Sequence, residues 1–144
     1  DQSSEWIYAD SGGFIALFLT RDQYHESAHS FQQAFTGLVY TTPLVIAETH
    51  DFLLYQGGSQ PARRFLEAIR EEQKAGDVRL ISISDERFDT AYRIIERYSD
   101  RTLTLVDAVG LAFLQTRDKP RWVFGYDDDF RLLDRCLLVP KDID

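Results

Sequence analysis

The stretch "WIYADSGGFIALFLT", residues 6–20, contains the change of pattern that decides the fold. "WIYAD" is a short apolar run rich in β-forming residues, and it ends in Asp10 just before Gly12 and Gly13. This pattern is typical of a buried strand that leads into a turn. "FIALFLT" follows as an apolar segment that predicts a first helix. The chain is therefore expected to open with a strand and a helix, with a carboxylate at their junction.

Strands and helices alternate along the rest of the chain. Further strands are expected in "LVYTTP", "VRLISIS", "RWVFGYD" and "RCLLVP", and further helices in residues 22–35, 43–55, 60–76, 85–98 and 104–116. Such alternation predicts a parallel sheet with helices on both of its faces. The expected fold class is α/β, with a central, mostly parallel sheet of about five strands.

The helix expected in residues 22–35 also contains a motif from a different class of enzyme. Its core-facing stripe is expected to consist of Tyr24, Ala28, Phe31 and Phe35. Beside that stripe lies "HESAH", His25-Glu26-Ser27-Ala28-His29, which matches the zinc metalloprotease signature, with Glu48 as a conceivable third ligand. The stripe leaves His25 and His29 on the polar flank of the helix. We therefore expect both histidines to face solvent, and a zinc metalloprotease is kept as an alternative function.

Composition and charge limit the possible classes of protein. A chain of 144 residues is expected to form a single domain over residues 1–144, with residues 1–5 as an unstructured end. Its 16 Lys and Arg against 24 Asp and Glu give a formal net charge of −8. This balance argues against a protein that grips duplex DNA through a broad basic face, although it does not exclude nucleic acid.

The cysteine count and the lengths of the apolar runs indicate the cellular compartment in which the protein is expected. The single cysteine, Cys136, cannot form an internal disulfide. The sequence contains neither a signal peptide nor an apolar run of about 18 residues that could cross a membrane. A cytoplasmic protein without membrane association is therefore expected.

Acidic residues follow two of the expected strands. Asp10 ends the first, and "VFGYDDDF", residues 123–130, places Asp127, Asp128 and Asp129 after another. Ligands of open α/β sheets bind beyond the carboxyl ends of the strands, so Asp10 and Asp127 are candidate site residues. The structural alternative is that "DDDFRLL" starts a short helix whose N-terminus favours negative charge.

Two further acids lie in helical segments where apolar residues would be expected. Glu48 is surrounded by apolar neighbours, and Asp107 shares a helical face with Gly110 and Leu111. Asp107 could instead complete a capping box with Thr104. Four acids that point to one edge of a sheet would repel one another unless a cation lay among them. Hard oxygen ligands favour Mg²⁺ or Mn²⁺ over zinc.

The order of these motifs resembles the PIN domain family, and in size most of all its VapC-type toxin ribonucleases. The resemblance rests on "ADSGGFIALF" with Asp10, "PLVIAETHDFL" with Glu48, "LTLVDAVGLAFL" with Asp107 and "VFGYDDDF" with Asp127. It implies a three-layer α/β/α nuclease in which these four acids are catalytic and bind Mg²⁺ or Mn²⁺. The metal would activate a water that hydrolyses single-stranded or loop RNA. It also implies a homodimer that binds an antitoxin protein.

Some site details remain open within this resemblance. Ser11 matches a hydroxyl residue that would orient Asp10, and Asp129 is the alternative to Asp127 as the fourth acid. Gly125 stands where the family usually has Thr or Ser, which removes one expected hydrogen bond. The chain could therefore be an RNA-processing nuclease or an inactive PIN-like binding module instead of a toxin.

Arginines are the expected contacts to RNA phosphates. Arg63 and Arg64 are the candidates, because guanidinium groups bind phosphate in a bidentate manner. The structural alternative for this pair is a solvated helix face.

Overall fold

Five parallel strands form the central sheet. The computed structural model describes residues 5–118 and 121–143. Its strands are β1 (Trp6–Ala9), β2 (Leu38–Thr41), β3 (Val78–Leu80), β4 (Arg121–Phe124) and β5 (Cys136–Val139). They lie in the order β3-β2-β1-β4-β5, and each neighbouring pair is parallel. The expected α/β class and the five-stranded sheet are confirmed.

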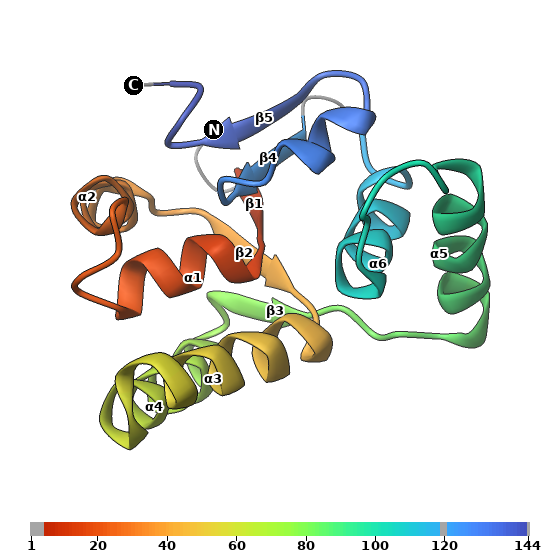
Figure 1. The fold of residues 1–144 in the computed structure, drawn as a ribbon. Coiled ribbons are helices and arrows are strands. Elements are labelled where there is room, and N and C mark those ends of the chain that lie inside the picture. Colours follow the sequence, from red (N-terminus) through yellow and green to blue (C-terminus); the bar gives the residue numbers. More distant parts are fainter. Residues whose placement is uncertain (1–4, 119–120, 144) are drawn as a thin grey trace.

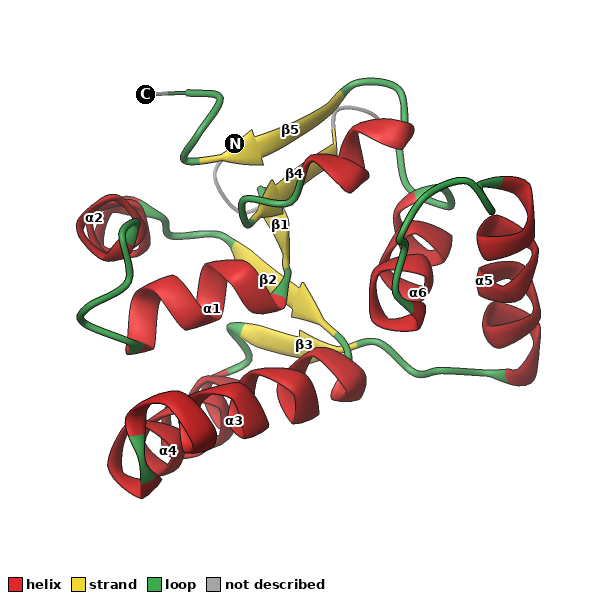
Figure 2. Ribbon diagram, in the orientation of Figure 1, coloured by secondary structure: helices red, strands yellow, loops and turns green. Residues whose placement is uncertain are grey.

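Helices cover both faces of this sheet. They are α1 (Ser11–Phe18), α2 (His25–Ala34), α3 (Pro43–Gly57), α4 (Ser59–Ala75), α5 (Asp85–Arg97) and α6 (Leu105–Leu114), with a short 3₁₀ helix, η2 (Asp128–Leu132). Figure 1 shows the sheet between the group α1 to α4 on one side and the pair α5 and α6 on the other. The same three layers are seen in Figure 2, where the yellow strands lie between red helices. The expected three-layer α/β/α arrangement is therefore confirmed.

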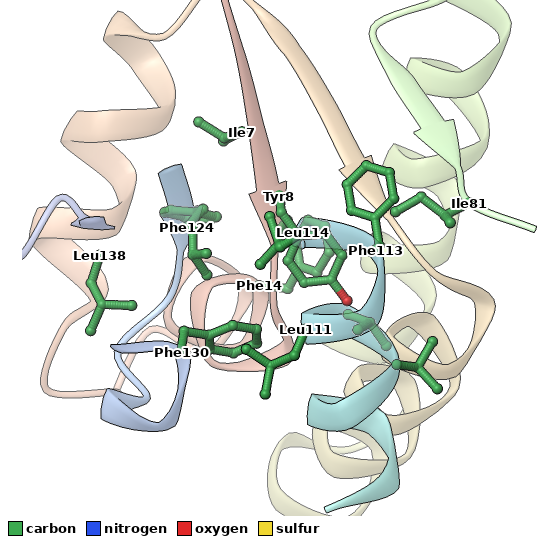
Figure 3. Packing of buried hydrophobic residues seen from close by; sticks show 14 of the residues in the cluster. Ile7, Tyr8, Phe14, Ile81, Leu111, Phe113, Leu114, Phe124, Phe130 and Leu138 are labelled. Atoms are coloured by element: carbon green, nitrogen blue, oxygen red, sulfur yellow. The ribbon is translucent and has the colours of Figure 1, made fainter. Parts of the chain in front are cut away.

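The core is centred on β1, the middle strand of the sheet. Ile7, Tyr8 and Ala9 are each at most 2% exposed, as expected for a strand covered on both faces. Figure 3 shows Tyr8 with Phe113 and Leu114 of α6, among the aromatic and aliphatic side chains that fill the interior. A rigid, buried β1 provides a fixed position for the residue that follows it, Asp10.

Helix α1 begins earlier than the glycines suggested. Gly12 and Gly13 were expected to form a turn, but both lie inside α1, which starts at Ser11 directly after Asp10. A Cβ atom on Gly13 would collide with the backbone carbonyl of Phe124. The glycine therefore allows α1 to pack directly on the end of β4, and it serves close approach rather than a turn.

The start of α2 also differs from the expectation. Tyr24 was expected to lie on the core-facing stripe, but it is the N-cap residue of α2 and is 39% exposed. Ala28 is fully buried, whereas Phe31 and Phe35 are half-buried and pack against the core. Because Tyr24 precedes the helix, helical spacing does not determine the direction of its side chain.

Several helix ends agree with the sequence signals. Thr42 Oγ1 accepts a hydrogen bond from the Val45 N–H at 3.1 Å, so Thr42 caps α3 as expected. α4 ends at Gly76, which has a left-handed backbone with φ of 85°. Residues 1–4 of the expected unstructured end lie outside the described residues, while the carbonyl of Glu5 accepts a hydrogen bond from the Leu38 N–H. No helix in the described part of the chain is both long and apolar enough to cross a membrane.

Candidate metal and active site

The sheet order brings the ends of β1 and β4 together at a switch point. The chain runs from β1 to β2 and β3 on one side, and returns to β4 and β5 on the other side of β1. Asp10 follows β1 directly, and its N–H donates a hydrogen bond to the carbonyl of Phe124, the last residue of β4, at 3.1 Å. Asp127 lies three residues beyond Phe124. Switch points of this kind are where α/β sheets bind ligands.

Asp107 reaches the same place from the first turn of α6. Thr104 is the N-cap of this helix, and its Oγ1 accepts a hydrogen bond from the Asp107 N–H at 3.1 Å. The capping role considered for this segment is therefore confirmed for Thr104. The Asp107 side chain is nevertheless turned into the protein, and the residue is only 7% exposed. Capping fixes the helix start and so positions the carboxylate.

Three of the predicted acids converge. One carboxylate oxygen each from Asp10, Asp107 and Asp127 lies within 4.8 Å of the other two. We call these three residues the acidic cluster. Asp10 and Asp107 are buried and Asp127 is half-buried. Ionised carboxylates this close to one another in a buried site are destabilising unless a cation or protons lie among them.

Burial and mutual repulsion raise the pKa values of two cluster members. The pKa of Asp10 rises from 3.8 to about 8, chiefly because the group is buried and then because Asp107 is near. The pKa of Asp107 rises to about 6, again mainly through burial and then through the charge of Asp127. In the opposite direction, the backbone N–H of Ser11 favours the charged form of Asp10 and lowers its pKa.

The cluster fits a hard divalent cation. Its donors are all carboxylates, the ligand type that Mg²⁺ and Mn²⁺ prefer. Oδ1 of Asp10 is buried and has no hydrogen-bond partner, which is costly unless a ligand completes it. Gly125 lies beside this group, because a Cβ there would be 3.7 Å from Oδ2 of Asp10. A Thr or Ser at that position would have brought a hydroxyl next to Asp10, and this chain lacks it.

Glu48 lies outside the cluster, although the sequence predicted it there. Within residues 5–118 and 121–143, the only group of three or more acids, His or Cys at ligand distance is the acidic cluster itself. Glu48, on α3, is half-buried, and its charge still contributes to the raised pKa values of Asp10 and Asp107. Because Mg²⁺ keeps several of its waters, a nearby acid that is not a direct ligand can act through water. Direct ligation by Glu48 remains a prediction.

The geometry distinguishes the three consecutive aspartates. Asp127 belongs to the cluster, and its Oδ1 also accepts a hydrogen bond from the Asp129 N–H at 2.9 Å, which caps η2. The carboxylate that caps η2 is thus also the one that lies in the acidic cluster. Asp128 is exposed and pairs with Arg131 and Lys141. Asp129 is outside the cluster, so the structure favours Asp127 as the site residue.

Arg101, which the sequence analysis did not select, lies beside Asp129. Its Nη1 lies 3.8 Å from Oδ1 of Asp129, and its side chain is 48% exposed. Arg63 and Arg64 are exposed on α4, which begins only after the 15 residues of α3 have led the chain away from β2, a path of about 22 Å. Figure 1 shows α3 and α4 extending from the sheet. Both arginines therefore lie exposed on a helix face, and their contact with RNA stays a prediction.

The "HESAH" motif does not form a metal site in the described part of the chain. Nδ1 of His25 lies 2.8 Å from the carbonyl oxygen of Ala16, and the ring centroids of His25 and His29 are 6.0 Å apart. His29 and Glu26 are exposed. Neither histidine belongs to a group of three potential ligands among the described residues. The structure therefore does not support the zinc metalloprotease alternative.

A cavity of about 420 Å³ lies apart from the acidic cluster. It is lined mainly by apolar residues of α1, α2, α4 and the sheet, among them Phe14, Phe18, Phe31 and Ile69. None of the predicted site residues lines it. The candidate active site is therefore the open edge of the sheet and not this cavity.

Comparison with known proteins agrees with this arrangement. No curated protein sequence matches the chain. The crystal structure of VapC20 from Mycobacterium tuberculosis, described as a sarcin-ricin loop cleaving toxin, has a similar fold with a TM-score of 0.78. The two sequences are 23% identical over 88% of this chain and 93% of that chain. A model of the PIN domain matches residues 7–135, which include each member of the acidic cluster. The chain therefore belongs to the PIN domain family.

Proposed function

We propose that this PIN domain is a Mg²⁺- or Mn²⁺-dependent endoribonuclease that cleaves single-stranded or loop RNA. The observation that carries the proposal is the convergence of Asp10, Asp107 and Asp127 at the switch point of the sheet. The similarity to VapC20, described as cleaving the sarcin-ricin loop, supports an RNA loop as substrate and a role as the toxin of a type II toxin-antitoxin pair. We expect such a toxin to act in the cytoplasm.

The chain's own residues would hold and orient the reacting groups. A bound divalent ion would supply a polarised water and positive charge against the phosphodiester. Asp10 is held at the end of buried β1, and Asp107 is held by the capped start of α6. The hydrogen bond from the Asp129 N–H fixes the carboxylate of Asp127. These rigid supports suit a site that must keep three like charges in one geometry.

Arg101 would bind the RNA backbone. Its contact with Asp129 is long, at 3.8 Å, and half of its side chain is exposed. An exposed ion pair of this kind contributes little to folding stability. The guanidinium group can therefore turn to a phosphate oxygen at small cost, and it joins Arg63 and Arg64 as a proposed RNA contact.

Gly125 favours one competing function, a PIN-like module that binds RNA or protein without cleaving. Gly125 offers no hydroxyl to Asp10, whose Oδ1 is buried without a hydrogen-bond partner. An unsupported ligand could weaken metal binding. An RNA-processing nuclease would share the chemistry of the proposed toxin and differ only in its substrate.

The proposed function is tested by cleavage of a structured RNA and of its DNA counterpart. We expect cuts in single-stranded or loop RNA that require Mg²⁺ or Mn²⁺, and weak or no action on duplex DNA, because a net charge of −8 attracts duplex poorly. A chelator and the Asp127→Asn substitution should each abolish the cuts. Asp129→Asn, which changes the neighbouring acid outside the cluster, should retain activity.

Two results would contradict this proposal. Cleavage that persists in chelator would remove the metal-dependent mechanism, and preference for duplex DNA would remove RNA as the substrate. RNA binding without cleavage at any metal concentration would favour the binding module.

A homodimer is the expected assembly. Of the apolar residues on α3 and α4, Leu53, Phe65 and Ile69 are buried in the core, whereas Phe52 and Tyr55 are 42% and 83% exposed. We expect a dimer by light scattering at concentrations on the order of tens of micromolar. Replacing Phe52 and Tyr55 by serine should yield a monomer, while Tyr92→Ser on α5 should not. A monomeric wild-type protein would contradict this expectation.

The expected protein partner is an antitoxin. A short gene immediately upstream that encodes a DNA-binding protein would support the toxin assignment, as would co-purification of its product with this chain. An RNA-processing nuclease would have neither. Finding an antitoxin partner would therefore distinguish a toxin from an RNA-processing nuclease.

A further inference from the structure

Two tyrosine rings are stacked, and one of them belongs to the residue that precedes Asp127 of the acidic cluster. Tyr126 stands between Gly125 and the cluster residue Asp127, and its ring packs on that of Tyr24. The ring centroids are 4.0 Å apart and the planes differ by only 8°. We call Tyr24 and Tyr126 the tyrosine pair. Because consecutive Cα atoms are about 3.8 Å apart, the backbone of Tyr126 lies beside Asp127 of the acidic cluster.

One serine ties the two tyrosines together. Oγ of Ser27 donates a hydrogen bond to the carbonyl of Tyr24 at 3.1 Å and lies 3.0 Å from the Tyr126 hydroxyl. Either hydroxyl can be the donor in the second contact. The N–H of Tyr24 also donates to Oδ1 of Asp22 at 2.9 Å. The pair is thus held in place without a ligand, which lowers the entropic cost of binding one.

One member of the tyrosine pair is exposed to solvent. Tyr24 is 39% exposed although Tyr126 covers one face of its ring. Within the described part of the chain no second aromatic ring contacts Tyr24, so its other face is not stacked. Single exposed aromatic residues are common on protein surfaces. What distinguishes Tyr24 is that its ring is already stacked on Tyr126, the residue that precedes Asp127 of the acidic cluster.

We infer that the tyrosine pair is a stacking platform for an unpaired base of the RNA substrate, with Tyr24 presenting the open face. This inference rests on the proposed function and adds a substrate subsite to it. Every base has a π-face, so stacking on a tyrosine tolerates different sequences. Bases inside a duplex are already stacked on their neighbours and cannot insert, so the platform selects single-stranded or looped RNA.

The charge of the chain makes such a platform useful. A protein with a net charge of −8 gains little from non-specific attraction to a polyanion. Binding must then rest on local contacts, namely the cluster, Arg101 and stacking. A base held on Tyr24 would fix the strand on the α2 side of the cluster, while Arg101 would hold it on the side of η2.

The test is steady-state cleavage of a single-stranded RNA by the wild-type protein and by Tyr24→Ala and Tyr24→Phe variants. Tyr24→Ala should raise KM by roughly 5- to 100-fold, the range for loss of one stacked base. Its kcat should change little, because Tyr24 does not touch the reacting phosphate. Tyr24→Phe keeps the ring and should behave like the wild type.

A scan of abasic substrates separates stacking from a merely structural role. Removing the base at one position of the RNA should raise KM for the wild type. We call this rise in KM the abasic penalty. For Tyr24→Ala, removing the same base should cause no further rise in KM. Tyr92→Ala, which removes a 58% exposed tyrosine on α5, is the matched control and should keep the full abasic penalty.

Equal abasic penalties in the wild type and in Tyr24→Ala would overturn the platform, and so would a Tyr24→Phe variant as impaired as Tyr24→Ala. In either case cleavage by the wild type would still stand. A wild-type protein that neither binds nor cleaves RNA would remove the proposed function and the platform together.

Discussion

Replacing Asp10 by asparagine is expected to abolish RNA cleavage and to raise the thermal stability of the metal-free protein. Asp10 is 3% exposed, and burial together with the nearby Asp107 raises its pKa to about 8. Near neutral pH the metal-free protein therefore holds either a buried charge or a proton at this position. Asparagine has nearly the same shape and carries no charge, and its amide can donate to the carboxylates of Asp107 and Asp127.

Both effects should be large. Each pKa unit corresponds to about 1.4 kcal/mol, so relieving Asp10 should stabilise the metal-free protein by on the order of a few kcal/mol at pH 8. A lost metal ligand removes several kcal/mol of transition-state stabilisation, which lowers the cleavage rate by at least about 100-fold. The gain in stability and the loss of activity have one cause. Asparagine lacks the negative charge that binds metal and that is costly to bury when no metal is bound.

Thermal unfolding in chelator and cleavage rates in Mg²⁺ or Mn²⁺ measure the two effects. Asp128→Asn is the matched control, because Asp128 is exposed, lies outside the cluster and pairs with Arg131 and Lys141. It should leave the cleavage rate unchanged and give no gain in stability. An active Asp10→Asn variant, or one that is less stable than the wild type in chelator, would show that the acidic cluster is not a metal site.

The fold and the centre of the site were accessible from the sequence because they depend on local patterns. Asp10 and Asp127 follow short apolar strands, and parallel strands end at the same edge of a sheet. Their meeting therefore follows from the strand assignments alone. Asp107 was recognised as an acid on an otherwise apolar helical face, in a helix of which every residue from Asp107 to Leu114 is buried.

The sequence could not decide the remaining site residues where the outcome depends on tertiary geometry. Glu48 was selected for its apolar neighbours, but whether it reaches the cluster depends on how α3 leaves β2, and its role as a ligand stays a prediction. Arg63 and Arg64 lie on a helix hairpin that carries them away from the sheet edge. Arg101 stands in the short connection between α5 and α6, where neither periodicity nor a motif marked it. Tyr24 was assigned to the core by helical spacing that begins one residue before the helix does.

The stability of the metal-free protein is expected to fall as pH rises from about 4 to about 8, as linkage requires for a carboxyl group whose pKa is raised by folding. Such a group holds its proton in the folded state over a range in which the unfolded chain has already lost it. Asp10, with a pKa raised from 3.8 to about 8, covers this whole range, and Asp107, with a pKa of about 6, adds to its lower half. The stabilising contribution is complete below the unfolded pKa and is lost as pH passes the folded values.

A bound divalent ion should offset this trend. Metal binding requires ionised carboxylates, so it displaces the protons that Asp10 and Asp107 hold in the metal-free state. Between pH 6 and 8, where Asp10 alone still holds its proton, the apparent affinity should rise by up to about tenfold per pH unit. A ligand that binds only the folded state raises its stability more as its affinity increases.

The measurement is the midpoint of thermal unfolding at a series of pH values, in chelator and in a fixed concentration of Mg²⁺ or Mn²⁺. The difference between the two midpoints should widen from pH 6 to pH 8 and level off above it. Asp10→Asn removes the group that titrates in this range, so its chelator curve should be flatter and its metal response small. The control Asp128→Asn changes an exposed acid whose pKa is held low by its hydrogen bonds to Arg131 and Lys141, so it should follow the wild type. A difference between the midpoints that does not change with pH would mean that any ion binds elsewhere, because no ion can enter the acidic cluster without displacing the proton of Asp10.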